Sequence, residues 1–405
     1  MKIFRNPKTF YLAVFLWITF ELLRSYLIMP FPGSQRLENV AIAHGLHQSR
    51  IFIRILLGAL LIASGYCSWP SLRASQKIGF GIASALLIAI CYITTGPMTA
   101  EAMFLPLNEL KIAAKPSTIL GTDPLIVGVV LQDANGKTQA RAYPLQMIGY
   151  HHQLRDNLAG TEIMVTYCTV CRTGRVFSPM VDGKLEQFRL VGMNRFNALF
   201  EDARTGSWWR QSTGRAIVGA RKGQTLPEIT SMQLSWSAWK QLHPNSTIAE
   251  ASPLFESQYI ALAAFSNGTN KSQLTGRNHA SWADKSWVIG LKINGQAHAF
   301  DWNALEKGAV RHTIGGVPVV GALAPDGLSF YFVDARDAKT HQELALSLSA
   351  DGREWIDAKS GHRWALSGAA LRMGNGDEHE ALHLLPSSQE FWHSWQTFQP
   401  GTNGP

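Results

Sequence analysis

Cys168 and Cys171, separated by two residues, have the types and spacing best suited to chemistry in this 405-residue sequence. Two thiolates in one tight turn can chelate Cu(I) or Zn(II), or they can cycle between dithiol and disulfide. His151 precedes Cys168 by 17 residues and could supply a further ligand across a strand pair, as could the adjacent His152. Three interpretations of the cysteine pair therefore stay open: a copper or zinc site, a thiol-disulfide centre, and a structural pair.

An internal repeat follows the first hundred residues. Both copies begin with a strand, an Asn-Gly turn and a second strand, starting at Ile126 and Val288. The later matches keep the same order: residues 202–209 with 357–364, 226–227 with 385–386, and the Trp-x-x-Trp blocks 236–239 with 392–395. Asn-Gly between apolar residues predicts a type I′ hairpin turn with positive φ at both positions. Four matched blocks in register indicate a duplication.

The two copies provide an internal control. Positions that both copies share are most simply scaffold, whereas polar positions found in one copy are candidates for chemistry. The shared positions, interpreted as mainly structural, are Asp202, Gly206, Trp209, Trp236 and Trp239. The positions in one copy are His151, Cys168, Cys171 and Gln211, which fall opposite Lys307, Ala324, Gly327 and Leu366. This pattern indicates one working copy and one copy retained as architecture.

Other residues are expected beside the two sulfurs. Arg172 directly follows the second cysteine and could stabilise a thiolate by its charge. We expect the sulfurs to be partly reachable from a pocket with Gln211 or Trp209 on its wall.

The basic charge lies in the N-terminal quarter. Residues 1–97 hold nine basic and two acidic residues, a net charge of +7. Residues 98–405 hold 28 basic and 27 acidic residues, a net charge of +1. A nearly neutral main region argues against nucleic acid as a partner, because phosphate binding needs a positive surface.

Three apolar runs, at residues 10–29, 51–69 and 78–95, are each long enough to cross a bilayer as a helix. A cleaved signal peptide has a single short apolar region and does not explain the second and third runs. Glu21, Arg24 and Arg54 lie within these runs and are interpreted as anchors near helix ends.

Short-loop charges predict the orientation of the spans. The N-terminal segment carries Lys2, Arg5 and Lys8, and the loop between the second and third spans carries Arg73 and Lys77. Positive loops stay in the cytoplasm. The sequence therefore predicts a protein of the cytoplasmic (inner) membrane with residues 98–405 on the periplasmic or extracytoplasmic side.

The expected architecture is a membrane region of three transmembrane helices followed by a mainly-β (β-rich α+β) exterior built from two repeats. Short strands separated by Gly, Asn and Asp indicate the β structure, and each Trp-x-x-Trp block predicts a short helix. The expected segments are a membrane domain (1–97), the first repeat with the cysteine site (98–250), a connection (251–280) and a degenerate second repeat (281–405).

The first repeat resembles a known family. The run TYCTVCRTGRVF, then DARTGSWWRQSTGRAIVG, and the upstream AYPLQMIGYHHQLRD resemble the family called domain of unknown function 3179. Its usual signature is Tyr-Cys-Pro-x-Cys with a later Thr-Gly-Ser-x-Trp-x-Gln. On this match the family's site residues are His151, Cys168, Cys171, Trp209 and Gln211. Thr169 replaces the usual Pro and His152 a common acidic residue, which could alter the acidity of the thiols.

The sequence favours a membrane-anchored extracytoplasmic protein that binds a metal through Cys168, Cys171 and His151. Two alternatives stay open: a thiol-disulfide oxidoreductase that uses the same cysteines, and a non-catalytic binding module with a structural cysteine pair. The partners expected are the membrane and a metal or small molecule.

Overall fold

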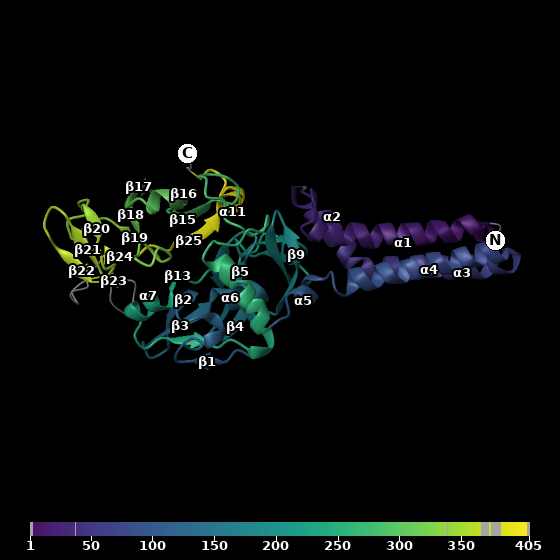
Figure 1. The fold of residues 1–405 in the computed structure, drawn as a ribbon, viewed down its shortest axis with the longest axis horizontal. Coiled ribbons are helices and arrows are strands. Elements are labelled where there is room, and N and C mark those ends of the chain that lie inside the picture. Colours follow the sequence, from purple (N-terminus) through teal and green to yellow (C-terminus); the bar gives the residue numbers. More distant parts are fainter. Residues whose placement is uncertain (1–2, 37, 338, 366–371, 374–381, 403–405) are drawn as a thin grey trace. The chain divides into compact units, whose positions relative to one another are not determined.

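The computed structural model describes every residue except 1–2, 37, 338, 366–371, 374–381 and 403–405. The chain is helical at its start and mainly β afterwards (Figure 1), so the predicted fold class is confirmed. Leu366, expected opposite Gln211 in the second copy, lies outside the described residues.

The helices lie mostly in the first quarter of the chain. The α-helices are α1 (Pro7–Ile28), α2 (Val40–Gln48), α3 (Arg50–Ser68), α4 (Ala74–Thr95), α5 (Ala100–Met103), α6 (Leu145–His151), α7 (Trp236–Leu242), α8 (Glu256–Ala261), α9 (Ala263–Ser266), α10 (Trp302–Leu305) and α11 (Trp392–Phe398). Short 3-10 helices are η1 (Ile3–Arg5), η2 (Ser34–Arg36), η3 (Trp69–Ser71), η4 (Thr118–Leu120) and η5 (Pro253–Phe255). The predicted helices at the Trp-x-x-Trp blocks are α7 and α11.

Strands predominate after the first hundred residues, with short helices between them. Strands of the first half are β1 (Ile112–Ala113), β2 (Leu125–Gln132), β3 (Thr138–Pro144), β4 (Gln153–Leu158), β5 (Thr161–Cys168), β6 (Thr173–Phe177), β7 (Met180–Val181), β8 (Lys184–Leu185), β9 (Phe188–Asn194), β10 (Asn197–Asp202), β11 (Trp208–Arg210), β12 (Ala216–Val218), β13 (Ser231–Ser235) and β14 (Thr247–Ala249). Later strands are β15 (Trp287–Ile293), β16 (Gln296–Asp301), β17 (Val310–Ile314), β18 (Val317–Leu323), β19 (Phe330–Asp334), β20 (Leu346–Leu348), β21 (Glu354–Asp357), β22 (Arg363–Ala365), β23 (Arg372–Met373), β24 (Leu382–His383) and β25 (Ser388–Phe391).

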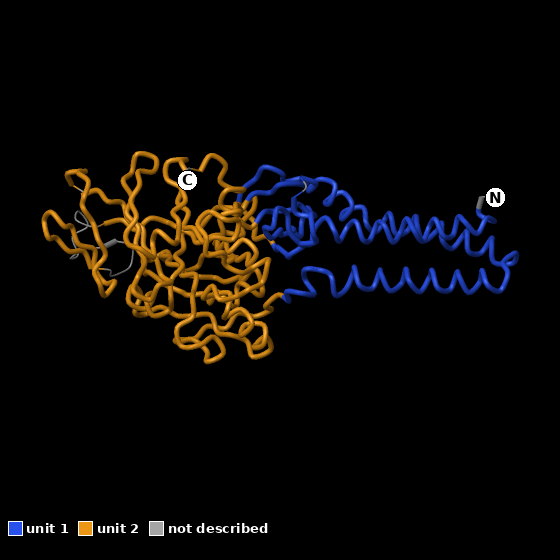
Figure 2. Tube along the Cα trace, turned by 45° about the horizontal axis from the view of Figure 1, so that its top comes forward, with its two compact units in different colours: residues 1–105, 187–210, 215–225 blue, residues 106–186, 211–214, 226–405 orange. Residues whose placement is uncertain are grey.

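The chain forms two compact units (Figure 2). Unit 1 combines Met1–Leu105 with Gln187–Arg210 and Arg215–Thr225, and unit 2 combines Pro106–Glu186, Gln211–Gly214 and Leu226–Pro405. The segment boundaries expected after residues 97, 250 and 280 stay a prediction.

Unit 1 contains three helical stretches long and apolar enough to cross a membrane: Pro7–Ile28, Arg50–Ser71 and Ala74–Thr95. These stretches support an N-terminal membrane anchor. Glu21 is fully buried and accepts hydrogen bonds from Arg54 at 2.6 and 2.9 Å and from Arg24 at 3.3 Å. A charge inside a membrane bundle is tolerated when it is paired, and this ion pair joins α1 to α3.

The sheet of unit 1 has the strand order β12-β11-β10-β9. Its apolar side chains share one cluster with the end of α1 and with α2: Leu27, Ile28, Met29, Ala43, Val191, Leu199 and Trp208. A Cβ added at Gly192 would lie 2.5 Å from the Ile28 carbonyl oxygen, so only glycine permits this approach. Strands β9–β12 therefore pack with the N-terminal helices.

Unit 2 is built on a five-stranded sheet, β1-β14-β3-β2-β13, and three-stranded sheets β4-β5-β6, β16-β15-β25, β17-β18-β19 and β20-β21-β22. The second hairpin turns at Asn294 and Gly295, with φ of 49° and 82°, as a type I′ turn requires. The first turn differs from the prediction. There the Asp133 carboxylate accepts from the Asn135 and Lys137 amides, both at 2.9 Å, which favours a longer loop.

The two copies repeat the same local packing. A Cβ at Gly128 would lie 2.4 Å from the Trp239 ring, and a Cβ at Gly290 would lie 2.1 Å from the Trp395 ring. Trp239 donates its indole N–H seven residues on, to Ser246, at 2.7 Å, and Trp395 does the same to Thr402 at 2.8 Å. These matched contacts support the interpretation of a duplication.

Candidate functional site

The cysteine pair occupies the turn between β5 and β6. Cys168 ends β5 and pairs with Thr173, the first residue of β6. Cys168 is 1 % exposed and Cys171 is fully buried, and both are thiols. The sulfurs were expected to be partly reachable, and their burial limits which molecules can approach them.

Arg172 has a φ of 56°, and its fully buried side chain fixes the turn from the inside. Its guanidinium donates to Gln389 Oε1 at 2.8 Å and to the carbonyl oxygens of Phe265 and Ser266, both at 2.9 Å. It also lies 3.8 Å from the Trp287 ring centroid. Burial lowers the pKa of Arg172 to about 10, which keeps it charged at neutral pH. These contacts show that Arg172 stabilises the conformation of the turn.

Lys285 places a second cation at the middle of the turn. Its Nζ donates to the carbonyl oxygen of Val170, between the two cysteines, at 2.6 Å. Burial lowers the pKa of Lys285 to about 8, while the charges of Cys171 and Cys168 act in the opposite direction. An ammonium beside two thiols stabilises the thiolate form of either one.

Strand β25, near the C-terminus, also contacts this turn. The Phe391 amide donates to the Cys171 carbonyl oxygen at 2.9 Å. The buried Glu390 carboxylate accepts from Arg175 of β6 at 2.8 Å and from Ser394 at 2.8 Å. Burial is the largest influence on Glu390 and raises its pKa, despite the pairing with Arg175. The cysteine turn is therefore held by residues from the C-terminal end of the chain.

His151 is the last residue of α6 and is buried. Its Nε2 lies 2.7 Å from the Tyr259 hydroxyl oxygen, and its ring packs edge-on against Phe255 and Tyr150. Tyr259 comes from α8 in the connection between the copies. This hydrogen bond engages Nε2, so that nitrogen could bind a metal only if the Tyr259 contact were broken.

His152 follows in a left-handed conformation with a φ of 62°. Its Nδ1 lies 3.1 Å from the Tyr150 carbonyl oxygen, and burial lowers its pKa to about 4. The side chain is therefore a neutral imidazole at physiological pH.

Gln211 lies where the two strands reach the turn. Its amide donates to the Thr166 hydroxyl and to the Thr173 carbonyl oxygen, both at 3.0 Å. Trp209 belongs to unit 1, where its indole donates to the Asp202 carboxylate at 2.8 Å. The bond to Asp202 agrees with the scaffold interpretation of both residues.

Across the described parts of the chain, no group of three or more His, Cys, Asp or Glu is arranged to hold a metal ion. The copper or zinc site at Cys168, Cys171 and His151 therefore stays a prediction. The turn matched to it in the sequence has the same length. There the Ala324 amide donates to the Ser329 carbonyl oxygen at 2.9 Å, five residues on, and Cys168 likewise pairs with Thr173, five residues on.

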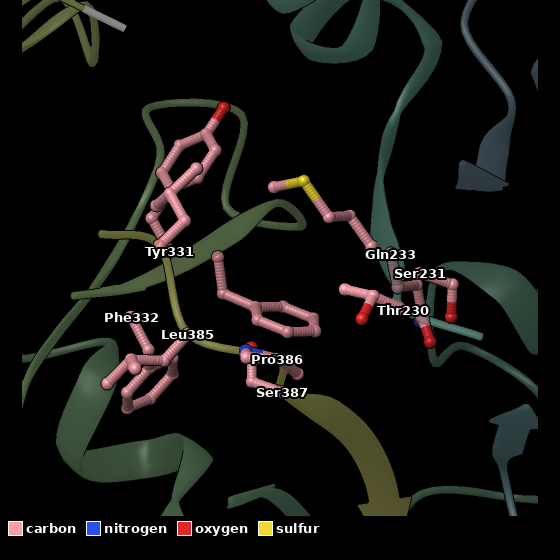
Figure 3. Close-up of a pocket in the computed structure, with 11 residues that line it drawn as sticks. Thr230, Ser231, Gln233, Tyr331, Phe332, Leu385, Pro386 and Ser387 are labelled. Atoms are coloured by element: carbon pink, nitrogen blue, oxygen red, sulfur yellow. The ribbon is translucent and has the colours of Figure 1, made fainter. Parts of the chain in front are cut away.

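A small cavity lies elsewhere in unit 2, where β13 faces β19 and residues 384–387 (Figure 3). Its volume is about 10 Å³, which is room for about one water molecule. This cavity is too small to serve as a substrate site.

The family model described as protein of unknown function (DUF3179) matches residues 109–402. The chain therefore belongs to that family. No curated protein and no solved structure matches the chain.

Sequence reasoning missed Lys285, Tyr259 and Phe391. Each contacts the turn or His151 from a distant segment, and Lys285 and Val170 are 115 residues apart. Lys285 stands in no motif of its own, so the sequence carried no local signal for it.

Proposed function

We propose that the exterior region is a thiol-disulfide redox protein in which Cys168 and Cys171 alternate between dithiol and disulfide. The observation that carries this proposal is the Lys285 ammonium at the turn, 2.6 Å from the Val170 carbonyl oxygen. A thiolate is the nucleophile in disulfide exchange, so a fixed cation beside both thiols favours the reactive form.

In the reaction, one thiolate attacks a sulfur of a substrate disulfide and a substrate thiolate leaves. The second cysteine, as thiolate, then attacks the mixed disulfide and releases the other substrate thiol. Two electrons pass to the substrate, and the protein keeps a Cys168–Cys171 disulfide. Because Cys168 and Cys171 are 1 % and 0 % exposed, the partner must be a small disulfide unless the turn opens.

The test uses the full-length protein with Cys67 and Cys91 changed to serine, so that the exterior pair supplies the only thiols. We expect glutathione redox buffers to interconvert two thiols and one disulfide with a definite midpoint potential. The Cys168→Ser variant should form no intramolecular disulfide. A pair that stays fully reduced across the whole range of buffers would contradict the proposal.

Metal binding is the second candidate, and the burial of two soft donors on one turn favours it. Two thiolates from one turn suit Cu(I), and the adjacent ammonium would offset their negative charge. A third bond from His151 Nε2 would require the loss of the Tyr259 contact.

Elemental analysis of protein purified without added metal separates the candidates. Metal binding predicts copper or zinc that is lost in Cys168→Ser, and His151→Gln should lower its content if the histidine is a ligand. Metal-free protein with two titratable exterior thiols would contradict this second candidate.

A further inference from the structure

An open hollow lies at one end of the helices of unit 1. Its volume is about 590 Å³, and its lining residues are Arg5, Gly65, Tyr66, Cys67, Trp69 and Pro70. The hollow belongs to the membrane anchor alone and is independent of the cysteine pair.

Local contacts hold together the helices and turns that surround the hollow. Pro70 lies in the 3-10 turn η3 that follows α3. The Ser68 hydroxyl donates to the Phe4 carbonyl oxygen at 3.0 Å and holds η1 against the end of α3. Gly65 has no side chain, and even a Cβ there would already touch the Phe10 ring at 3.5 Å, so α1 and α3 approach closely.

The lining combines two exposed aromatic rings with one cation, Arg5, and the cation Lys77 lies near one of those rings. Tyr66 is 82 % exposed and Trp69 is 49 % exposed. Such amphipathic rings are typical of the boundary between head groups and acyl chains. Lys77 places its Nζ 5.1 Å from the Trp69 ring centroid, and Arg5 is exposed at the rim.

The charge at this end has one sign. Residues 1–20 and 55–100 contain no Asp or Glu. The first carboxylate of α1, Glu21, lies 14 residues beyond Pro7, about 21 Å along the helix. A ligand with a negative charge and an apolar body complements this surface.

We infer that this hollow binds the head group of an anionic phospholipid from the leaflet that borders it. The Arg5 guanidinium faces the phosphate, because its planar fork of donors matches phosphate oxygens. The rings of Tyr66 and Trp69 cover the glycerol region, and the acyl chains follow the apolar surface of α3.

The test uses the full-length protein in phosphatidylcholine nanodiscs with increasing phosphatidylglycerol, and native mass spectrometry of the released protein. We expect saturable retention of phosphatidylglycerol and no comparable retention of phosphatidylcholine. Arg5→Gln should weaken retention about fivefold, since a basic residue at an anionic surface contributes about 1 kcal/mol.

Lys8→Gln is the matched control, because Lys8 is exposed at the same end but does not line the hollow. It removes the same charge, and we expect less than a twofold change. Equal losses in both variants would mean only general attraction to a charged bilayer and would overturn the inference. Equal retention of both lipids would overturn it as well.

Discussion

The Nζ of Lys285 lies 2.6 Å from the carbonyl oxygen of Val170, the residue before Cys171. This contact places a positive charge from a distant segment of the chain at the cysteine turn. Lys285 also lies 4.6 Å from the Phe391 ring centroid, so its side chain is held from two sides.

Replacing Lys285 with Gln should slow alkylation of Cys168 and Cys171 at pH 7 about tenfold, which corresponds to a thiol pKa one unit higher. The reason is the loss of the ammonium that stabilises the thiolate. In the unaltered protein this stabilisation is present below about pH 8 and fades as the pH rises through the pKa of Lys285. Iodoacetamide kinetics against pH, with Cys67 and Cys91 replaced, measures both effects. Lys292→Gln, an exposed lysine on β15, is the control, and equal rates in the two variants would refute the role of Lys285.

His152 makes the free energy of unfolding depend on pH in the acidic range. Burial lowers its pKa from 6.5 to about 4, so the unfolded chain binds the proton first as pH falls. The contribution of neutral His152 to the free energy of unfolding is fully present above pH 6.5. It is lost as the pH falls towards 4, a loss of about 3 kcal/mol in all.

Urea unfolding at pH 7 and pH 4.5 tests this effect with His152→Asn, since Asn tolerates the left-handed conformation. The variant should lose less stability on acidification than the unaltered protein. His341→Asn is the control, because His341 has a similar φ of 58° and is exposed. An unchanged acid dependence in His152→Asn would contradict the prediction.

Gly290→Ala should destabilise unit 2 by about 1–3 kcal/mol, the usual cost of overpacking. The added Cβ would lie 2.1 Å from the six-membered ring of Trp395. Combining it with Trp395→Phe removes those ring atoms, so the double variant should cost less than the sum of the single changes. Thermal unfolding of the two single variants and the double variant measures this cycle. If the stability losses of the single variants simply added in the double variant, the clash with the Trp395 ring would not be the cause of the loss in Gly290→Ala.

Trp364→Ala should cost about 3–5 kcal/mol, because the indole is buried and its residue pairs with Trp355 across β21 and β22. Cys168→Ser should cost much less while it removes the thiol chemistry. Denaturant unfolding compares the two. Equal losses of stability would favour a purely structural role for the cysteine.

A reporter fused after residue 405 tests the orientation of the chain. The short-loop charges predict activity of a reporter that works only outside the cytoplasm. Activity of a strictly cytoplasmic reporter at that position would reverse the predicted topology.

Much of the fold was predictable because its signals are local. The apolar runs predicted the long helices, and Asn294-Gly295 predicted a type I′ turn from two adjacent residues. The first hairpin turn was missed in detail because the Asp133 side chain, outside the Asn-Gly pair, accepts two amide hydrogens of the loop.

The site was predictable only in part. Cys168, Cys171 and Gln211 stood out because the matched positions of the predicted second copy lack them, and in the structure the Gln211 amide donates hydrogen bonds to both strands that carry the turn. The partners of the turn were not predictable, since they depend on tertiary contacts. His151 and Tyr259 are 108 residues apart, and no local pattern links them.

The distance along the chain between the cysteines and Lys285 sets an order of events during synthesis. The ribosome makes Cys168 and Cys171 more than a hundred residues before Lys285, and Phe391 later still. Until the C-terminal segment is made, the nascent thiols have neither the Lys285 cation nor the β25 strand that bonds to the Cys171 carbonyl oxygen. If the exterior region is exported as predicted, the cysteines meet the oxidants of that compartment unprotected. The rates of translation and of folding then determine whether the newly made Cys168–Cys171 pair is a dithiol or a disulfide.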